Sequence, residues 1–365
     1  MARMLANVPP SGEGLNILLV LTRYLGDTLL MTGVIRSLRH AYPKAHICAL
    51  VANKGKFALQ GNTDLDKLLV ISDKFSMKEL LTLLPKHFRR YDWVINDKPS
   101  GKCETFAFLF GKLGCKKHWQ ARVIDQKRAG TWRSKPPFCH HSVMDDEETE
   151  HRIVRGSKLL QPLGIQQQTG VWAPTEEPPF TLSKPYWVLH IPASNDLKQW
   201  PIESWVQLIR WLIEHQFAVV LTGSPAQRDQ QLVSSVMQLL GEADNVEDLS
   251  GQLSIAQMAT LIEKSAGYIG PDGGTTHLAS AFNVPIIAIF NKHNAAMWAP
   301  WPYQLSVEAY MSTPFNNDSS HQVFANVAVL QPIKRKFEQD QNLANSVVDV
   351  EKVIDSIKEI TKRNH

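Results

Sequence analysis

The chain has 365 residues, of which 44% are hydrophobic and 20% are charged, and its formal net charge is +4. The length predicts about two domains, and the composition is that of an ordered globular protein rather than a disordered one. A charge this mild does not by itself indicate nucleic-acid binding. Cys48, Cys103, Cys115 and Cys139 are scattered without a CxxC pair. This argues against a zinc cluster or a disulfide framework and fits a reducing compartment.

The N-terminal segment 1–14 is expected to be flexible, and it lacks an apolar core long enough for a signal peptide. No apolar run approaches the roughly 20 residues that span a bilayer. We therefore expect a cytoplasmic protein, with a peripheral membrane role left open. The adjacent His140 and His141 have no partners at metal-ligand spacing, so a surface or loop role is favoured over metal binding.

A first series of alternating elements occupies residues 15–165. Short apolar runs are typical of buried parallel strands, and amphipathic segments of 10 to 15 residues between them are typical of covering helices. The predicted strands are 17–21, 47–51, 68–71 and 93–96, and the predicted helices are 28–41, 76–89, 104–113 and 148–162.

A polar, proline-containing segment at 166–185 predicts a linker. A second series follows over 186–342, within which 310–342 is predicted to be polar and irregular. A final amphipathic helix lies within 343–365, at about 343–361, and is expected to pack back toward the N-terminal domain. The chain is therefore predicted to be α/β, with two Rossmann-like domains facing across a cleft. The predicted strands of the second series are 186–191, 217–223, 246–249, 268–270 and 285–290, and its helices are 202–215, 226–240, 254–265 and 274–282.

The segment YIGPDGGTTHLASAFNVPIIAIF, residues 268–290, carries the most specific motif. A predicted strand ends at Gly270, and a helix begins after Asp272. Gly273 and Gly274 allow close approach of a ligand, and a helix N-terminus favours an anion such as a diphosphate. His277, in the first turn, could donate to a phosphate oxygen. The alternative is that Asp272 is only a helix cap and His277 a half-buried surface residue.

Two further turns fall at the same predicted sheet edge, where ligands bind in such folds. LHIPASNDLKQWPIESW (189–205) places Ser194 and Lys198 between a strand and a helix, and the lysine could neutralise a phosphate. LTGSPAQ (221–227) places Gly223 where a nucleoside could pass close to the backbone. A solvated loop lysine is the alternative for Lys198.

Together the three turns resemble glycosyltransferase family 9, the heptosyltransferases of lipopolysaccharide core assembly, over about residues 15–302. The matching motifs are LKQWP, DGGTTH and, near the N-terminus, RYLGDTLLMTGVIRSL. The segments MWAPW, HRIVRGSKLLQPLGI and TWRSKP are most similar to the heptosyltransferase III branch of that family.

The resemblance implies a GT-B architecture and an inverting transfer of heptose from ADP-heptose to the lipopolysaccharide inner core. It implies that 15–165 binds the acceptor and that 186–342 binds the ADP-sugar. Ser194 and Lys198 would contact the diphosphate. Carried over by motif, the residues that would bind heptose and phosphates are Asp272, Gly273, Gly274 and His277, and Gly223 would lie at the nucleoside. The enzyme would work at the cytoplasmic face of the inner membrane.

The sequence departs from the family pattern at three places. Gly273 stands where a hydroxyl residue is usual, so one side-chain donor is missing, and Ala193 stands where a hydroxyl residue is common. The 221–227 turn has no acidic residue of the kind that some members present to the nucleoside. These differences leave another nucleotide-sugar donor as an alternative.

The turn after the first strand carries Arg23, Gly26 and Asp27 in place of a GxGxxG phosphate loop. The resemblance implies that this turn faces the acceptor and that Asp27 is the catalytic base. An inverting displacement needs a group that removes the proton of the attacking hydroxyl. Helix capping is the alternative for Asp27, and Arg23 is expected to assist in binding the anionic acceptor.

The stretch 112–135 is strongly basic and has two tryptophans interleaved. Its arginines Arg122, Arg128 and Arg133 are predicted to bind the acidic, phosphorylated acceptor or anionic lipid at the membrane surface. A solvated loop and a nucleic-acid site are the alternatives, of which nucleic acid is the least favoured.

Two other classes of protein are alternatives to a glycosyltransferase. A Rossmann-type epimerase or dehydrogenase would need a glycine-rich dinucleotide turn, and the first turn has only Gly26. A catalytically inactive, glycan-binding relative of the same fold stays open. Because no DxD pair follows a donor-type strand, neither an obligatory metal nor another cofactor is expected.

Overall fold

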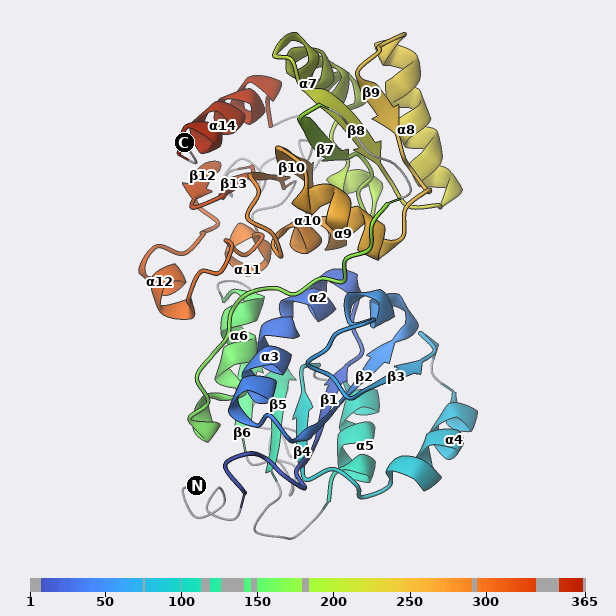
Figure 1. Ribbon diagram of the computed structural model, residues 1–365, viewed down its shortest axis with the longest axis vertical. Helices are drawn as coiled ribbons and strands as arrows, with labels where there is room; N and C mark the ends of the chain where they lie inside the picture. The colour runs from blue at the N-terminus through green and yellow to red at the C-terminus, as the bar shows by residue number, and fades with distance from the viewer. Residues whose placement is uncertain are drawn as a thin grey trace. The chain divides into compact units, whose positions relative to one another are not determined.

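The protein is described by a computed structural model that covers most of the chain (Figure 1). It divides into two compact units, Met1–Trp172 and Ala173–His365, and the division falls inside the predicted linker segment 166–185. None of the described helices is long and apolar enough to cross a membrane. The described residues are 8–74, 76–98, 100–112, 119–125, 141–145, 150–178, 184–290, 294–332 and 348–363, with the backbone alone described for 119–125, 144–145 and 197.

The first unit is built on a six-stranded parallel sheet with the order β3-β2-β1-β4-β5-β6. Side chains alternate between its faces, so Leu18 and Val20 join a core beneath α4 and α5. Its strands are β1 (Asn16–Leu21), β2 (His46–Ala52), β3 (Lys67–Ile71), β4 (Trp93–Asn96), β5 (Trp119–Asp125) and β6 (His141–Asp145). Its helices are α2 (Leu25–Leu30), α3 (Thr32–Ala41), α4 (Met77–His87), α5 (Gly101–Phe110) and α6 (Arg152–Lys158), with 3-10 turns η1 (Asn53–Ala58) and η4 (Gln161–Leu163).

The single helix predicted over 28–41 is in fact two helices, α2 and α3, which meet at Met31. The Thr32 hydroxyl donates to the carbonyl of Leu29 at 2.6 Å, and side-chain bonding of this kind competes with regular helix bonding. The same hydroxyl oxygen accepts the backbone N–H of Trp172 at 2.9 Å. Through Thr32, the break between α2 and α3 therefore binds Trp172, the last residue of the first unit, to the start of α3.

The second unit is built on a seven-stranded sheet with the order β12-β13-β11-β10-β7-β8-β9, in which β12 alone runs antiparallel to its neighbour. The strands are β7 (Tyr186–His190), β8 (Ala218–Thr222), β9 (Val246–Asp248), β10 (Gly267–Pro271), β11 (Ile286–Ile289), β12 (His321–Phe324) and β13 (Val327–Leu330). The helices are α7 (Ile202–Glu214), α8 (Gln227–Leu240), α9 (Ile255–Glu263), α10 (Gly274–Ala279), α11 (Ala295–Trp298), α12 (Val307–Ser312) and α14 (Val350–Arg363), with a 3-10 turn η5 (Asp196–Lys198).

The prediction that 310–342 is irregular is wrong for the described part of that segment. It contains β12 and β13, and Val327–Leu330 is fully buried and pairs with β11. Four residues of apolar sequence are too few to distinguish a buried strand from a loop by periodicity. The strand β13 is stabilised by pairing with β11, which lies about forty positions earlier in the chain.

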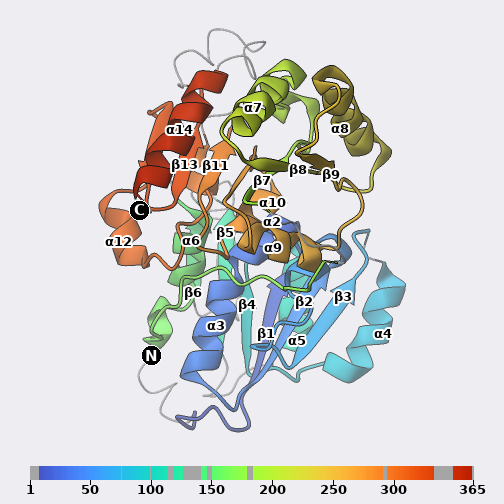
Figure 2. The ribbon, with the colours of Figure 1, turned by 45° about the horizontal axis from the view of Figure 1, so that its top comes forward.

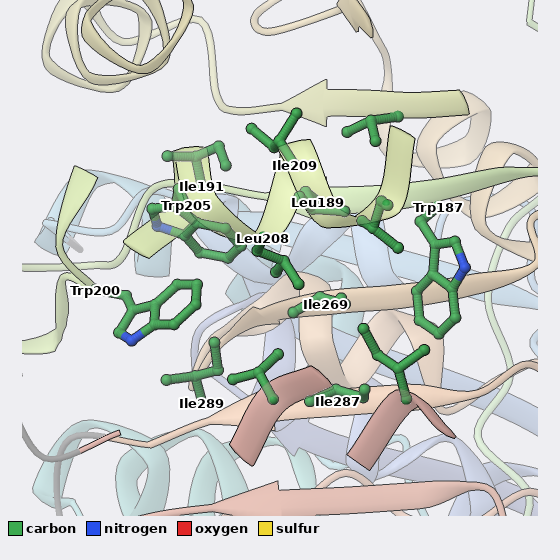
Figure 3. Close-up of a cluster of buried hydrophobic side chains, with 14 of the residues drawn as sticks. Trp187, Leu189, Ile191, Trp200, Trp205, Leu208, Ile209, Ile269, Ile287 and Ile289 are labelled. Carbon is green, nitrogen blue, oxygen red and sulfur yellow. The ribbon is translucent and has the colours of Figure 1, made fainter. Parts of the chain in front are cut away.

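The core of the second unit contains three buried indoles, which Figure 3 shows among aliphatic side chains of β7, α7, β10 and β11. Trp200 and Trp205 meet edge to face with ring centroids 4.8 Å apart. The Trp200 indole also donates to the carbonyl of Val348 at 2.9 Å. The tryptophan of the LKQWP motif is thus an anchor that fixes the turn before α7.

Helix α14 belongs to this same core, because Val353, Ile357 and Ile360 are buried in it. The helix contacts α7 and β13 (Figure 1 and Figure 2). The expectation that the final helix packs back toward the N-terminal domain is therefore wrong for its apolar face. Amphipathic periodicity predicted the helix and its apolar stripe, but a stripe does not identify the surface that covers it.

Candidate functional site

The second unit has a cavity of about 260 Å³ at the carboxyl ends of its strands. It is bounded by the residues that follow β7 and β10 and by the first turn of α8. This is the edge at which ligands bind in parallel α/β sheets. The lining residues are His190, Pro192, Ala193, Ser194, Arg228, Asp229, Asp272, Gly273, Gly274 and Thr275.

Lys198 and Asp272 form an ion pair beside this cavity, with Nζ and Oδ2 2.5 Å apart. The Asn195 side chain caps the turn that carries Lys198, accepting the lysine backbone N–H at 3.2 Å. The Gln199 side chain braces the same turn, since it accepts from Ala193 at 3.0 Å and donates to Ile191 at 2.9 Å. The sequence prediction that Lys198, Ser194 and Asp272 come together is consistent with this geometry. A lysine that retains two N–H donors beyond its carboxylate partner can still bind an anion.

Helix α10 begins at the cavity with Gly273 as its N-cap, in extended backbone. No side chain caps this end of the helix, and Asp272 instead accepts from Lys198 and, at 3.4 Å, from the Asn294 amide. The helix-cap alternative for Asp272 is therefore not what the geometry shows. Free backbone N–H groups remain at the start of α10, on the wall of the cavity.

The open space at Gly273 leads to a prediction. A Cβ built there meets only the carbonyl of Pro271, at 3.8 Å. We expect Gly273→Ser to leave the thermal unfolding temperature within about 2 °C of wild type, because surface changes alter stability little. At Gly267, by contrast, a Cβ would lie 2.3 Å from the buried ring of Trp187. Gly267→Ala should lower the free energy of unfolding by about 1–3 kcal/mol. A large loss in Gly273→Ser would contradict the open geometry.

His190, which the motif analysis did not single out, lies on the cavity wall at the end of β7. Its Nδ1 is 3.0 Å from the hydroxyl of Thr222, and its Nε2 is 3.2 Å from that of Thr275. Burial lowers the pKa of His190 to about 4, although the nearby Asp229 acts in the opposite direction. The imidazole is therefore neutral at neutral pH and bridges the ends of β8 and α10 rather than providing positive charge.

Arg228 and Asp229 are the charged cavity residues that sequence reasoning missed. Arg228 donates to the carbonyl of Ala193 at 2.9 Å and pairs with Asp196 at 2.6 Å. Asp229 accepts from the Ser224 hydroxyl at 2.6 Å. The sequence expectation of no acidic residue in the 221–227 turn holds for the turn itself. The first turn of α8, two residues later, nevertheless brings a carboxylate to the cavity.

Besides Lys198, two predicted donor residues, Gly223 and His277, lie near the cavity without lining it. His277 is 3% exposed, and its ring centroid is 6.2 Å from that of Trp298. Gly223 lies behind the cavity wall, where an added Cβ would be 3.1 Å from Pro192 Cγ. The prediction that His277 is directly at a phosphate stays a prediction.

In the first unit, Asp27 is part of a chain of charges at the carboxyl edge of β1 and β4. Asp27 Oδ1 accepts from Arg23 at 3.2 Å, and the Arg23 Nε lies 3.0 Å from Asp97 Oδ2. Asp97 in turn pairs with Arg155 at 2.6 Å, and both of these side chains are 2% exposed. Asp27 itself remains 17% exposed. Arg23, which is itself held by the buried Asp97, thus orients the Asp27 carboxylate. The Asp27 side chain does not cap α2, whose N-cap is Tyr24.

This buried pair gives a stability prediction. Asp97→Ala leaves Arg155 without its buried carboxylate, and we expect the free energy of unfolding to fall by about 3–5 kcal/mol. Asp64, which pairs with the half-exposed Arg36, is the matched control. Asp64→Ala should cost no more than about 1 kcal/mol. Urea unfolding of both variants measures the difference, and equal losses would contradict a structural role for the Asp97–Arg155 pair.

Of the predicted acceptor-binding arginines, only Arg23 has a described side chain. Arg122 lies in β5, for which only the backbone is described, and Arg128 and Arg133 lie outside the described residues. Within the described residues, no group of three or more His, Cys, Asp or Glu side chains is arranged to hold a metal ion.

Comparisons with known proteins give a consistent result. The sequence model of glycosyltransferase family 9 (heptosyltransferase) matches residues 144–322. The chain is 26% identical over 296 residues to lipopolysaccharide heptosyltransferase 3 of Escherichia coli K12, covering 76% of this chain and 83% of that protein.

Solved structures with the same fold include a glycosyl transferase family 9 protein from Veillonella parvula and E. coli heptosyltransferase WaaC with ADP. The first has a TM-score of 0.74 at 18% identity and covers 96% of this chain and 98% of its own. The second has a TM-score of 0.70 at 15% identity and covers 95% of this chain and 100% of its own. The predicted α/β fold class with GT-B architecture is confirmed.

Proposed function

Because the chain belongs to glycosyltransferase family 9 and is a glycosyltransferase, we propose that it transfers heptose, with inversion, from ADP-heptose to the inner core of lipopolysaccharide. Among its relatives are proteins named as lipopolysaccharide heptosyltransferases. E. coli WaaC has been solved with ADP and with ADP-2-deoxy-2-fluoro heptose.

The observation that carries the proposal is the set of charged and backbone donors around the cavity of the second unit. Lys198 and Arg228 provide positive charge beside it, and the start of α10 provides backbone N–H groups. A diphosphate leaving group develops negative charge as the glycosidic bond breaks. Fixed donors aimed at that charge stabilise the transition state, so the donor sugar is expected to bind with its diphosphate between Lys198 and α10.

The proposed base is Asp27 of the first unit. As the acceptor hydroxyl attacks the anomeric carbon, its proton passes to the Asp27 carboxylate, and ADP departs with the bonding electron pair of the broken C–O bond. One carboxylate is sufficient, because the departing diphosphate needs charge stabilisation rather than a proton. Arg23, fixed by Asp97, holds the Asp27 carboxylate in position.

Lys198 and Arg228 also bear on the metal requirement. Two cationic side chains near the expected diphosphate can supply the charge that a divalent cation supplies in other transferases. We therefore propose that turnover does not require a metal. Turnover that persists in excess chelator is the expected result, and full loss that is restored by adding a divalent cation would contradict it.

Identity of the donor is tested by a thermal-shift panel of ADP-, UDP-, GDP- and CDP-sugars. A ligand that binds only the native state raises its stability in proportion to RT ln(1 + [L]/Kd). ADP-heptose should give the largest rise, and a larger rise with another nucleotide sugar would favour the alternative of a different donor. A chain that binds ADP-heptose without releasing ADP in the presence of acceptor would be an inactive, glycan-binding relative.

The acceptor is proposed to be acidic and lipid-anchored, which would place the enzyme at the cytoplasmic face of the inner membrane. The basic stretch 112–135 is the sequence feature that favours an acidic partner. Replacing Arg122, Arg128 and Arg133 together by Ser should weaken use of a phosphorylated acceptor more than use of a dephosphorylated one. An equal loss for both acceptors would remove these arginines from acceptor recognition.

A further inference from the structure

Helix α4 presents an apolar stripe to solvent instead of burying it. Met77 is 67% exposed and Leu81 63%, and Phe88, just beyond the helix, is 51% exposed. Positions 77, 81 and 88 are spaced to fall on one side of the helix. The helix also has an ordinary buried side, where Leu80, Leu83 and Leu84 contact the core of the first unit. The exposed stripe is therefore additional to what the fold requires.

The stripe continues onto α5 through Arg89. The Arg89 guanidinium lies 5.3 Å from the ring centroid of Phe88 and 4.6 Å from that of Phe108, which is 40% exposed. The same side chain donates to the carbonyls of Phe108 and, at 2.8 Å, of Gly111. Arg89 thus joins the two phenylalanines into one surface. Figure 1 shows α4 beyond β3, at the outer edge of the first unit.

Basic residues outnumber acidic ones in the segment that carries this surface, which we call the α4 face and define by Met77, Leu81, Phe88, Phe108, Lys78 and Lys86. Between residues 72 and 90 the sequence has five Lys or Arg residues and two acids, Asp73 and Glu79. Both acids are engaged at the start of α4. Asp73 accepts the backbone N–H of Lys54 at 3.1 Å, and Glu79 accepts from Ser72 and Ser76 in the capping box. Lys78, which follows Met77, and Lys86, in the last turn of α4, both have exposed side chains.

We propose that the α4 face is the surface by which this protein binds an anionic phospholipid membrane. Protruding apolar side chains on a helix that also exposes lysines, with Arg89 against Phe88 and Phe108, match the boundary between charged headgroups and acyl chains, where amphipathic helices lie. Anionic lipid attracts each nearby basic side chain. Protein–protein interfaces, by contrast, are depleted in lysine. The inference rests on the proposed function only in that a lipid-anchored acceptor requires the enzyme to reach a membrane.

Vesicle flotation of the full-length protein tests the proposal. Wild type should float with vesicles of phosphatidylglycerol and phosphatidylethanolamine and should stay behind with pure phosphatidylcholine. Met77→Ser combined with Leu81→Ser should weaken flotation at least about tenfold through lost apolar insertion. Lys78→Glu combined with Lys86→Glu should weaken it by about tenfold or more through lost charge attraction.

The matched control combines Leu239→Ser with Met311→Ser. These side chains are 49% and 54% exposed but belong to α8 and α12 of the second unit, outside the α4 face. The control should float like wild type. Flotation that is absent in wild type, or unchanged in both α4-face variants, would overturn the proposal. If the α4-face variants float like wild type but no longer bind a protein partner that wild type binds, the proposal is also overturned. The α4 face would then be a protein interface.

A soluble, deacylated acceptor separates this inference from the proposed function. The α4-face variants should transfer sugar to that acceptor at the wild-type rate, because the substituted residues are exposed and lie outside the catalytic groups. If wild type fails to use the soluble acceptor, the proposed function is at fault. If wild type uses the soluble acceptor but does not float with anionic vesicles, the proposal that the α4 face binds a membrane is contradicted.

Discussion

Asp27→Asn is expected to lower turnover by roughly 10²–10⁴-fold, the usual contribution of a general base, while donor affinity stays at the wild-type value. The amide has nearly the same shape as the carboxylate and can keep the contact with Arg23, but it cannot accept the proton of the acceptor hydroxyl. Turnover is measured by ADP release, and donor affinity by calorimetry with ADP-heptose.

Asp64→Asn is the matched control for this substitution, since Asp64 belongs to the same unit and also pairs with an arginine. It should leave both turnover and donor affinity unchanged. Turnover near the wild-type rate in Asp27→Asn would remove Asp27 from the role of base. If Asp27→Asn lowers donor affinity as well as turnover, Asp27 instead contributes to the conformation that binds the donor.

Lys198→Ala has the second largest expected effect, a fall in affinity for ADP and for ADP-heptose of roughly 10- to 100-fold. A hydrogen bond to a charged group contributes about 1.5–3 kcal/mol. The substitution also leaves Asp272 without its cationic partner at 2.5 Å, which adds carboxylate repulsion against the diphosphate. Adenosine, which has no phosphate, should bind equally to wild type and variant.

Lys264→Ala serves as the control for Lys198, because Lys264 also pairs with a carboxylate, but with Glu177 rather than with a residue that lines the cavity. Its affinity for ADP should match that of wild type. Lys198→Arg keeps the charge, and we expect it to retain more ADP affinity than Lys198→Ala. An unchanged affinity in Lys198→Ala would show that the lysine is not at the diphosphate.

The order of strands and helices was largely predictable from the sequence because each apolar run and each amphipathic stripe is a local pattern. The strand 93–96 was predicted with its observed bounds, and the helix predicted over 202–215 is α7, Ile202–Glu214. The LKQWP and DGGTTH turns were also found locally, since each motif holds both its anchor and its polar residues within a few positions. The proximity of Lys198 to Asp272 then follows from the topology, because β7 and β10 are neighbours in the sheet.

Residues whose role depends on long-range packing were not predictable in this way. Asp97 and Arg155 lie 58 positions apart and meet only because β4 and α6 bring them together. Arg228 looks like an ordinary surface arginine in the first turn of α8 until the turn after β7 is placed beside it. The same reason explains α14, whose apolar stripe gave its secondary structure but not its partner. In α4, the sequence could not distinguish the buried apolar side chains from the exposed ones, and the structure was needed to show which side of the helix is buried.

The central claim is tested most directly by a single-turnover reaction of wild type with ADP-heptose and a purified, deacylated inner-core acceptor. ADP and the sugar product are quantified in the same samples by mass spectrometry, and the anomeric configuration of the new linkage is determined by NMR. The account predicts one heptosylated product per ADP released, with a configuration opposite to that of the donor. Retained configuration, or an acceptor left unmodified with no ADP released, would contradict it.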